Sequence, residues 1–242
     1  MLDAPSLHIG RISVRIEPYS VVVPVRVTDQ YLSRSLESIS EQTVPPSSTY
    51  VVINGTDGST CPSSEVCAGF DFVTPIFIQE LGMVPAVVHG ITMVAEEVVM
   101  FLDSDDLWVA DKAERQLTLL QQQTDVDAVS SRTQNFRELD DGSCVDLASE
   151  IAGLLGATAF RTNVFTRFGG IDPKASHFTF LYRWWENARK LGIVEAPIES
   201  VGLRRRVHAN SGWVSQTEHG KNELLREIRR ITRAQNAERS HK

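Results

Sequence analysis

The sequence predicts an α/β protein with a doubly wound, mostly parallel central sheet. Between residues 19 and 123, four short apolar runs are each followed by a loop or helical pattern. The runs are rich in β-branched residues and apolar on both faces, as is typical of strands buried between two helical layers. Repeated strand-then-helix units give parallel strands joined by crossovers. The mixed pattern after residue 124 predicts a smaller region of strands and helices.

The elements of the first half follow from their local patterns. YSVVVPV at 19–25 is the first expected strand, and Asp29 can cap the helix in DQYLSRSLESISEQ. TYVVI is the second strand and ends in the loop-forming sequence NGTDGS. FVTPIFIQ is the third, before a helix near 84–95, and EVVMFL is the fourth, before DSDDLW and a helix near 111–123.

The second half is expected to contain four strands and a tryptophan-rich helix. VDAVSSRTQNF, GATAFRT, IVEAPIES and VGLRRRVH have strand patterns, whereas 180–191 has a helical pattern. Residues 138–150 are polar and predict a hairpin tip or a mobile loop. Trp184 and Trp185 are adjacent on the helix and therefore point about 100° apart. Either both pack in the core or one faces a binding cleft.

The composition is that of an ordinary globular domain. We expect a lead-in at 1–18, one domain at 19–215 with halves at 19–123 and 124–215, and a C-terminal helix at 216–242. Apolar residues make up 42% of the chain, and the net charge of −7 argues against a general nucleic-acid binder. No apolar stretch is long enough for a membrane span, and the first residues lack the basic-then-apolar pattern of a signal peptide, so we expect a cytoplasmic protein. The three cysteines lack metal-site spacing.

The expected C-terminal helix is basic and amphipathic. From Lys221 onward, the sequence contains seven basic and three acidic residues. An apolar stripe of Leu224, Ile228 and Ile231 lies opposite several arginines. This helix can dock on the body of the protein, join a second copy, or make a peripheral contact with an anionic membrane.

The most chemically suggestive segment follows the fourth strand. Ligands of open parallel sheets bind beyond the carboxyl ends of the strands, and Asp103, Asp105 and Asp106 fall there. Carboxylates so close together repel one another unless a cation lies among them, and their hard oxygen atoms suit Mg²⁺ or Mn²⁺. The alternative is a solvated loop in which Asp105 or Asp106 caps the next helix, and of the two we favour Asp106 as the cap.

Several segments in order resemble the family 2 glycosyltransferases of the GT-A fold. The resemblance rests on VVVPV, SLESISEQTVPPSSTYVVINGT, VAEEVVMFLDSDDLWVADKAERQL, GATAFRTNVFTRFGGID and RRRVHANSG, and covers about residues 19–215. It implies a GT-A-like sheet with a nucleotide-sugar half and a smaller acceptor half. It also implies transfer of a sugar, with inversion, from a nucleotide-sugar donor to an acceptor hydroxyl.

The resemblance implies roles for individual residues. Asp103 and Asp105 match the family's DxD motif, and with His208 they are the expected ligands of Mn²⁺ or Mg²⁺. Arg204, Arg205 and Arg206 are possible phosphate partners. The expected donor-binding residues are Pro24, Val25, Arg26, Asn54, Asp57, Asp103 and Ser104. A divalent cation at the diphosphate would act as a Lewis acid as the glycosidic bond breaks.

This sequence departs from the family pattern at three places. Ile53 replaces an acidic residue that reads the nucleobase, and Val87 and Val88 replace an Arg-Asn pair. The usual Glu-Asp pair that supplies the general base aligns with Phe180 and Leu181, which accept no proton. The replacement candidates are Asp172, Glu186 and His177, of which Asp172 and Glu186 are the expected catalytic residues. The acceptor is not defined by any motif: a saccharide, a lipid-linked group and a protein hydroxyl all remain open. A non-catalytic GT-A-like protein that binds nucleotide or carbohydrate is the alternative.

Overall fold

A computed structural model describes residues 17–139, 141–150, 154–208, 226 and 229–230. The expected lead-in and C-terminal helix therefore lie almost wholly outside the described residues. The strands are β1 (Tyr19–Arg26), β2 (Ser48–Asn54), β3 (Val73–Ile78), β4 (Val98–Phe101), β5 (Leu107–Trp108), β6 (Ala128–Glu138), β7 (Cys144–Glu150), β8 (Thr158–Arg161) and β9 (Glu195–Arg206). The helices are α1 (Leu32–Ser40), α2 (Pro62–Cys67), α3 (Met83–Met93), α4 (Lys112–Gln122), η1 (Leu155–Ala157), α5 (Val164–Arg167) and α6 (Phe180–Lys190).

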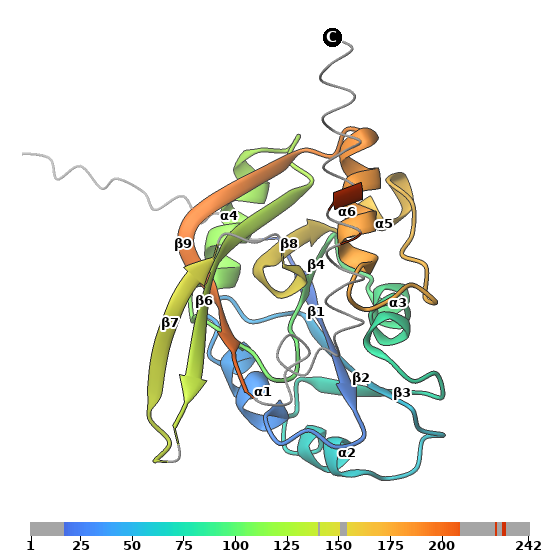
Figure 1. Ribbon diagram of the computed structural model, residues 1–242, viewed down its shortest axis with the longest axis vertical. Coiled ribbons are helices and arrows are strands. Elements are labelled where there is room, and N and C mark those ends of the chain that lie inside the picture. Colours follow the sequence, from blue (N-terminus) through green and yellow to red (C-terminus); the bar gives the residue numbers. More distant parts are fainter. Residues whose placement is uncertain (1–16, 140, 151–153, 209–225, 227–228, 231–242) are drawn as a thin grey trace, which may run out of the picture.

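One sheet carries all of these strands, in the order β3-β2-β1-β4-β8-β6-β9-β5, and β7 pairs with β6 outside this path. β3, β2, β1 and β4 are parallel, as the strand-then-helix pattern predicts. β8 pairs antiparallel with both β4 and β6, whereas β9 runs parallel to β6. The expected change from a parallel to a mixed region after residue 124 is confirmed. Figure 1 shows β6, β7 and β9 bending away from the parallel strands.

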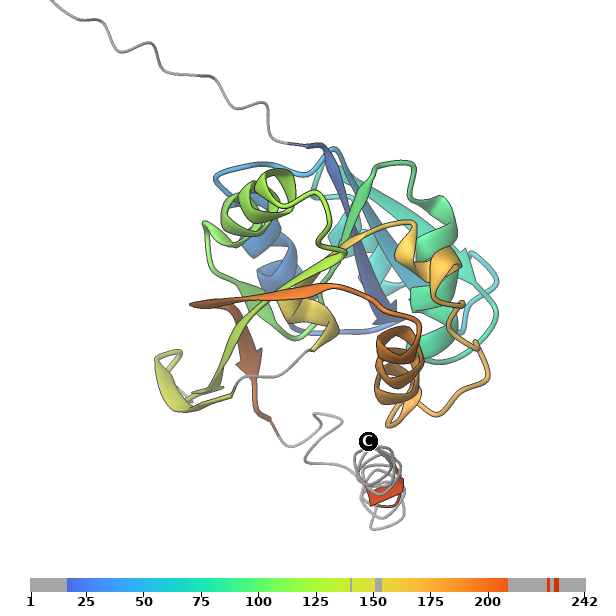
Figure 2. The same cartoon turned by 90° about the horizontal axis from the view of Figure 1, so that it is seen from above.

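Two apolar clusters occupy the two faces of the sheet. Alternate residues of β1 point to opposite sides: Val21 and Val23 join one cluster, and Val22 joins the other. Side chains of α1 and α4 complete the first cluster, and those of α3, α5 and α6 complete the second. Figure 2 shows α1 and α4 on one side of the parallel strands and α3 and α6 on the other. The sheet is therefore doubly wound.

Close packing fixes α3 against the sheet. A Cβ atom on Gly90 would lie 2.3 Å from Cγ1 of Val22 in β1, so only glycine permits the observed approach. Val87, at one position of the family's missing Arg-Asn pair, is fully buried in the same cluster. This position is occupied by an apolar residue because it belongs to the core.

Some elements differ from the sequence prediction. The expected strands at 193–200 and 201–208 form one strand, β9, whose register against β6 shifts near Arg132. Of the two forms predicted for the polar segment 138–150, the hairpin is correct, but most of the segment is strand β7, which pairs antiparallel with β6; Gly142 adopts the left-handed φ of +80° in the turn. Among the described residues, no helix has the length and apolar character that crossing a membrane requires.

Candidate active site

The carboxyl ends of the parallel strands converge on one edge of the sheet. β1 ends at Arg26, β2 at Asn54 and β4 at Phe101. The backbone N–H of Leu102 still bonds to the carbonyl oxygen of Val22, at 3.1 Å, so the loop that begins at Asp103 leaves directly from the ladder. The sheet therefore places the acidic loop at the edge where open α/β folds bind ligands.

Asp103, Asp105 and Asp106 form one acidic cluster at this edge. One ligand atom from each residue lies within 4.8 Å of those of the others. Burial, followed by the negative charge of Asp105, raises the pKa of Asp103 to about 7. Burial also raises the pKa of Asp106 well above its usual range, and the two neighbouring carboxylates add to this effect. The cluster therefore holds carboxylates under mutual repulsion, which a bound cation would relieve.

Polar contacts from α1 and the loop before it fix the acidic loop. The hydroxyl oxygen of Ser35 lies 2.7 Å from the carbonyl oxygens of both Ser104 and Asp106. Ser104 donates its own hydroxyl to Asp29 at 2.6 Å, and Asp29 also accepts the N–H of Tyr31 at 2.8 Å. The Ser104 side chain, an expected donor-binding group, is thus engaged within the protein. The sequence suggested Asp29 only as a helix cap.

Asp106 does not cap the following helix. α4 begins only at Lys112, and the Asp106 carboxylate accepts the backbone N–H of Arg206 at 2.8 Å instead. Asp106 is 4% exposed. The capping interpretation was wrong because β5 and its turn intervene before the helix begins. Asp106 joins the acidic loop to the end of β9.

His208 lies in contact with the acidic cluster. Its Nε2 atom is 3.0 Å from Oδ2 of Asp105, and both side chains are partly exposed. Two adjacent ligands of an octahedral Mg²⁺ or Mn²⁺ ion, each at about 2.1 Å, also lie about 3.0 Å apart. The contact is a hydrogen bond or ion pair in this structure, and its donor types and spacing also suit two ligands of one divalent cation.

The three consecutive arginines of β9 have different surroundings. Arg204 pairs with Asp146 of β7 at 2.9 Å, on the surface. The positive charge of Arg205 lowers the pKa of both Asp103 and Asp106, although less than burial raises it. Arg206 is buried. Arg205 is thus the arginine whose positive charge acts on the carboxyl groups of Asp103 and Asp106.

The expected nucleotide pocket is bordered by the ends of β1 and β2. Pro24 and Val25 are buried, whereas the side chain of Arg26 is exposed. Asn54 is 3% exposed, and its amide group donates to the carbonyl of Val25 at 2.6 Å and accepts the N–H of Gly82 at 3.0 Å. Asn54 therefore fixes the shape of this edge through backbone contacts.

Asp57 and Ile53 occupy opposite environments at the end of β2. Asp57 is exposed and accepts the N–H of Ser59 at 3.2 Å, and hydrogen bonds from Ser59 lower its pKa. Ile53, which stands where the family has an acidic residue, is fully buried in the core. Only Asp57 of the two can meet a ligand at this edge.

The acceptor side carries both candidate bases in different settings. Asp172 is exposed in the loop before α6, and one of its carboxylate oxygens accepts the N–H of Lys174 at 2.9 Å. Glu186 pairs with Lys190 at 3.0 Å and with Arg230. Partial burial acts to raise the pKa of Glu186, but these two cations outweigh it and lower the pKa.

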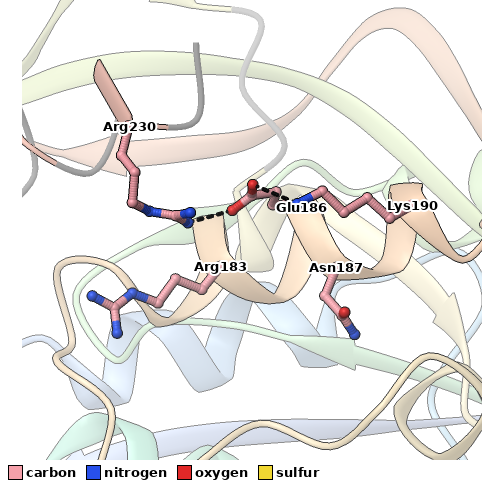
Figure 3. A pocket seen from close by; sticks show the side chains of 5 residues that line it. All are labelled: Arg183, Glu186, Asn187, Lys190 and Arg230. Atoms are coloured by element: carbon pink, nitrogen blue, oxygen red, sulfur yellow. Dashed lines mark hydrogen bonds and ion pairs between the residues drawn. The ribbon is translucent and has the colours of Figure 1, made fainter. Parts of the chain in front are cut away.

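Figure 3 shows Glu186 between Lys190 and Arg230. Arg183, Asn187 and these three residues line a cavity of about 410 Å³ along α6. Trp184 and Trp185 point away from it: each is 4% exposed, and their rings lie 5.1 Å apart in the core. Of the two alternatives for these tryptophans, core packing is therefore correct. Phe180, at the usual position of the base, is also buried.

A family model described as "Glycosyltransferase like family 2" matches residues 17–220. The chain belongs to this family. No curated protein matches the sequence.

Solved structures show which fold this family 2 chain has. S. aureus TarS matches with a TM-score of 0.62 and 14% identity, over 87% of this chain and 43% of that one. S. aureus TarS 1-349 matches with a TM-score of 0.60 and 14% identity, over 78% and 60%. The same fragment in complex with UDP matches with a TM-score of 0.59 and 14% identity, over 88% of this chain and 65% of that one. The chain thus has the GT-A fold but spans less than two thirds of each of these proteins.

Two groups of contacts around the candidate site were not found from the sequence. Asp29, in the loop before α1, and Ser35, in α1, hold the acidic loop in place. In the sequence, both residues look like ordinary polar residues near the start of a helix. Glu138 and Tyr31 reach the same region by contacting Arg206. No local spacing signals these contacts, because they join residues far apart in the chain.

Proposed function

We propose that this family 2 chain transfers a sugar from a nucleotide-sugar donor to an acceptor hydroxyl, with inversion and with the help of Mg²⁺ or Mn²⁺. One observation carries the proposal: the contact between Asp105 and His208 within the acidic cluster, at the carboxyl edge of the sheet. Hard oxygen ligands and one imidazole at this spacing suit a divalent cation. The complex of S. aureus TarS 1-349 with UDP supports a nucleoside diphosphate as the leaving group.

Several residues at the carboxyl edge of the sheet would bind the donor together. Asp105, His208 and Asp103 would hold the cation, which would supply Lewis-acid stabilisation to the departing diphosphate. Arg205 would add positive charge on the same side, and the exposed Arg26 would border the nucleotide. Preorganised charges of this kind stabilise the charge that develops in the transition state.

Of the two candidates for the general base, Asp172 is the better supported. Its carboxylate is exposed, and it forms no salt bridge with any of the residues that the structure describes. Glu186 is held by Lys190 and Arg230, and its lowered pKa makes it a weaker proton acceptor. We therefore assign proton abstraction from the acceptor hydroxyl to Asp172, and a role in holding α6 to Glu186.

A second candidate function is binding without catalysis. The observation that favours it is the buried, apolar Phe180 at the position where the family usually has its base. In that case the edge would still bind a nucleotide with a cation, but no sugar would be transferred. Neither function defines the acceptor, which is a saccharide, a lipid-linked group or a protein hydroxyl.

A thermal-shift screen of nucleoside diphosphates with and without Mn²⁺ tests the proposed site. A ligand that binds only the folded chain raises the melting temperature. We expect a shift with nucleotide and Mn²⁺ together that exceeds the sum of the separate shifts. Hydrolysis of a matching nucleotide sugar then separates the two candidates, because only the transferase accelerates it. No shift with any nucleotide would contradict both.

A further inference from the structure

Arg206, at the end of β9, connects the acidic loop to β6 and to Tyr31, the residue before α1. Its backbone N–H donates to the carboxylate of Asp106 at 2.8 Å, and its Nε donates to the carbonyl oxygen of Asp105 at 2.9 Å. Its Nη1 pairs with Glu138 at the end of β6. A single residue at the end of β9 therefore fixes both the backbone and a side chain of the acidic loop.

Aromatic rings enclose the Arg206 guanidinium. The ring of Tyr31 lies 4.4 Å from its central carbon and the ring of Phe136 lies 4.7 Å away. The ring of Tyr31 also contacts that of His208, with ring centroids 4.9 Å apart. Arg206 thus contacts Asp105 directly, at its backbone carbonyl oxygen, and is linked to His208 indirectly, through the ring of Tyr31. These are the two residues whose side chains meet at 3.0 Å.

The burial of Arg206 rules out direct contact with a ligand. The residue is 2% exposed, and its Nη2 has no hydrogen-bond partner among the residues that the structure describes. A buried cation with an unsatisfied donor contributes little to stability compared with a well-packed apolar side chain. Stability alone is therefore a poor reason for an arginine at this position.

We propose that Arg206 is a positioning residue that sets the spacing between Asp105 and His208 and thereby the affinity for a divalent cation. The inference rests on the proposed function, in which these two residues hold the cation. The planar guanidinium can donate to the Asp105 carbonyl and to Glu138 at once while it stacks between two rings. A lysine ammonium has neither the fork nor the flat surface.

The test compares Arg206→Lys and Arg206→Met with Arg204→Met as a matched control. Arg204 lies on the same strand and also stacks on Phe136, but it pairs with Asp146 on the surface. Binding of Mn²⁺ in the presence of UDP is followed by the loss of the free Mn²⁺ signal in electron paramagnetic resonance. We expect both Arg206 variants to bind Mn²⁺ about 10-fold or more weakly, and Arg204→Met to bind like the wild type.

Two further readouts separate positioning from charge and from stability. Removing a positive charge near carboxylates strengthens cation binding by simple electrostatics, so weaker binding by Arg206→Met indicates geometry. The melting temperature of the metal-free variants shows whether they are folded. In the folded Lys variant, the ring resonance of His208, assigned with His208→Gln, should shift before any Mn²⁺ is added.

Each outcome has a defined meaning. If the wild type binds no Mn²⁺ with UDP or with any other nucleoside diphosphate, the proposed function fails, and this inference fails with it. If the wild type binds and folded Arg206→Lys binds within twofold of it, only the inference is overturned. If the Arg206 variants do not fold, Tyr31→Leu replaces them, because Tyr31 is partly exposed, contacts both Arg206 and His208, and can be replaced without a change of charge. A threefold or greater loss of affinity in that variant supports the inference, and unchanged affinity overturns it.

Discussion

Replacing Asp103 by asparagine should make the metal-free protein more stable above neutral pH. Burial and the charge of Asp105 raise the pKa of Asp103 from 3.8 to about 7. A carboxyl whose pKa is raised by folding binds its proton more tightly in the folded chain. Its contribution to stability is therefore full below pH 4 and is lost as the pH rises through 7. A difference of about 3 pKa units corresponds to about 4 kcal/mol.

Asparagine keeps the shape of the protonated carboxyl and never ionises. We therefore expect Asp103→Asn to raise the free energy of unfolding by about 2–4 kcal/mol at pH 8, and by no more than about 2 kcal/mol at pH 5. Urea denaturation in the presence of a chelator, at both pH values, measures the two differences. Asp125→Asn is the matched control, because Asp125 is exposed and its replacement should change stability by less than about 0.5 kcal/mol.

The same variant should lose its advantage when ligand is present. Mn²⁺ with a nucleoside diphosphate should stabilise the wild type and leave Asp103→Asn unchanged, because the variant lacks a carboxylate beside the cation. Equal stability of wild type and variant at pH 8, or an equal gain at pH 5 and pH 8, would refute the raised pKa of the partly buried Asp103 carboxyl group.

Two other variants test the packing and the acceptor side. Gly90→Ala should lower the free energy of unfolding by about 1–3 kcal/mol in chemical denaturation, since the new methyl group would overlap Val22; a neutral or stabilising effect would contradict the close approach of α3 to β1. Asp172→Ala should lower kcat about 10²–10⁴-fold with little change in donor affinity, whereas Glu186→Ala should lower kcat less than about tenfold and reduce the melting temperature; steady-state kinetics that reverse this order would assign the base to Glu186.

The parallel half of the fold was predictable because its signals are local. Each of β1, β2, β3 and β4 is a short apolar run with no competing helical pattern, and the loops after β1, β2 and β4 contain polar residues. Parallel pairing then brings these loops to the same edge without further information. The acidic cluster at that edge was predicted on this basis.

The mixed half was less predictable because its boundaries depend on pairing partners. Residues 193–208 contain a proline and a glycine, which suggest two strands, yet pairing along β6 keeps them in one strand with register shifts. The helix α2, which begins at Pro62, is too short for a periodic pattern and was missed.

Individual side chains of the site were the hardest part to predict. Asp106 has the sequence position of a helix cap, but it bonds to Arg206, which is 100 residues away in the chain. Asn54 looks like a ligand-binding group at the end of a strand, yet its amide is satisfied by Val25 and Gly82. Which partner such a polar group finds is decided by tertiary contacts rather than by neighbouring residues.

The most direct test of the central claim is calorimetric titration of nucleoside diphosphates into the wild type and Asp105→Asn, with and without Mn²⁺. Asp105 is the carboxylate in contact with His208, and its replacement by asparagine removes a ligand charge without opening a cavity. We predict that a nucleoside diphosphate binds the wild type only with Mn²⁺ and that Asp105→Asn, though folded, does not bind it. Equal affinity of the two proteins, or binding that is independent of Mn²⁺, would contradict a metal-dependent donor site at this edge of the sheet.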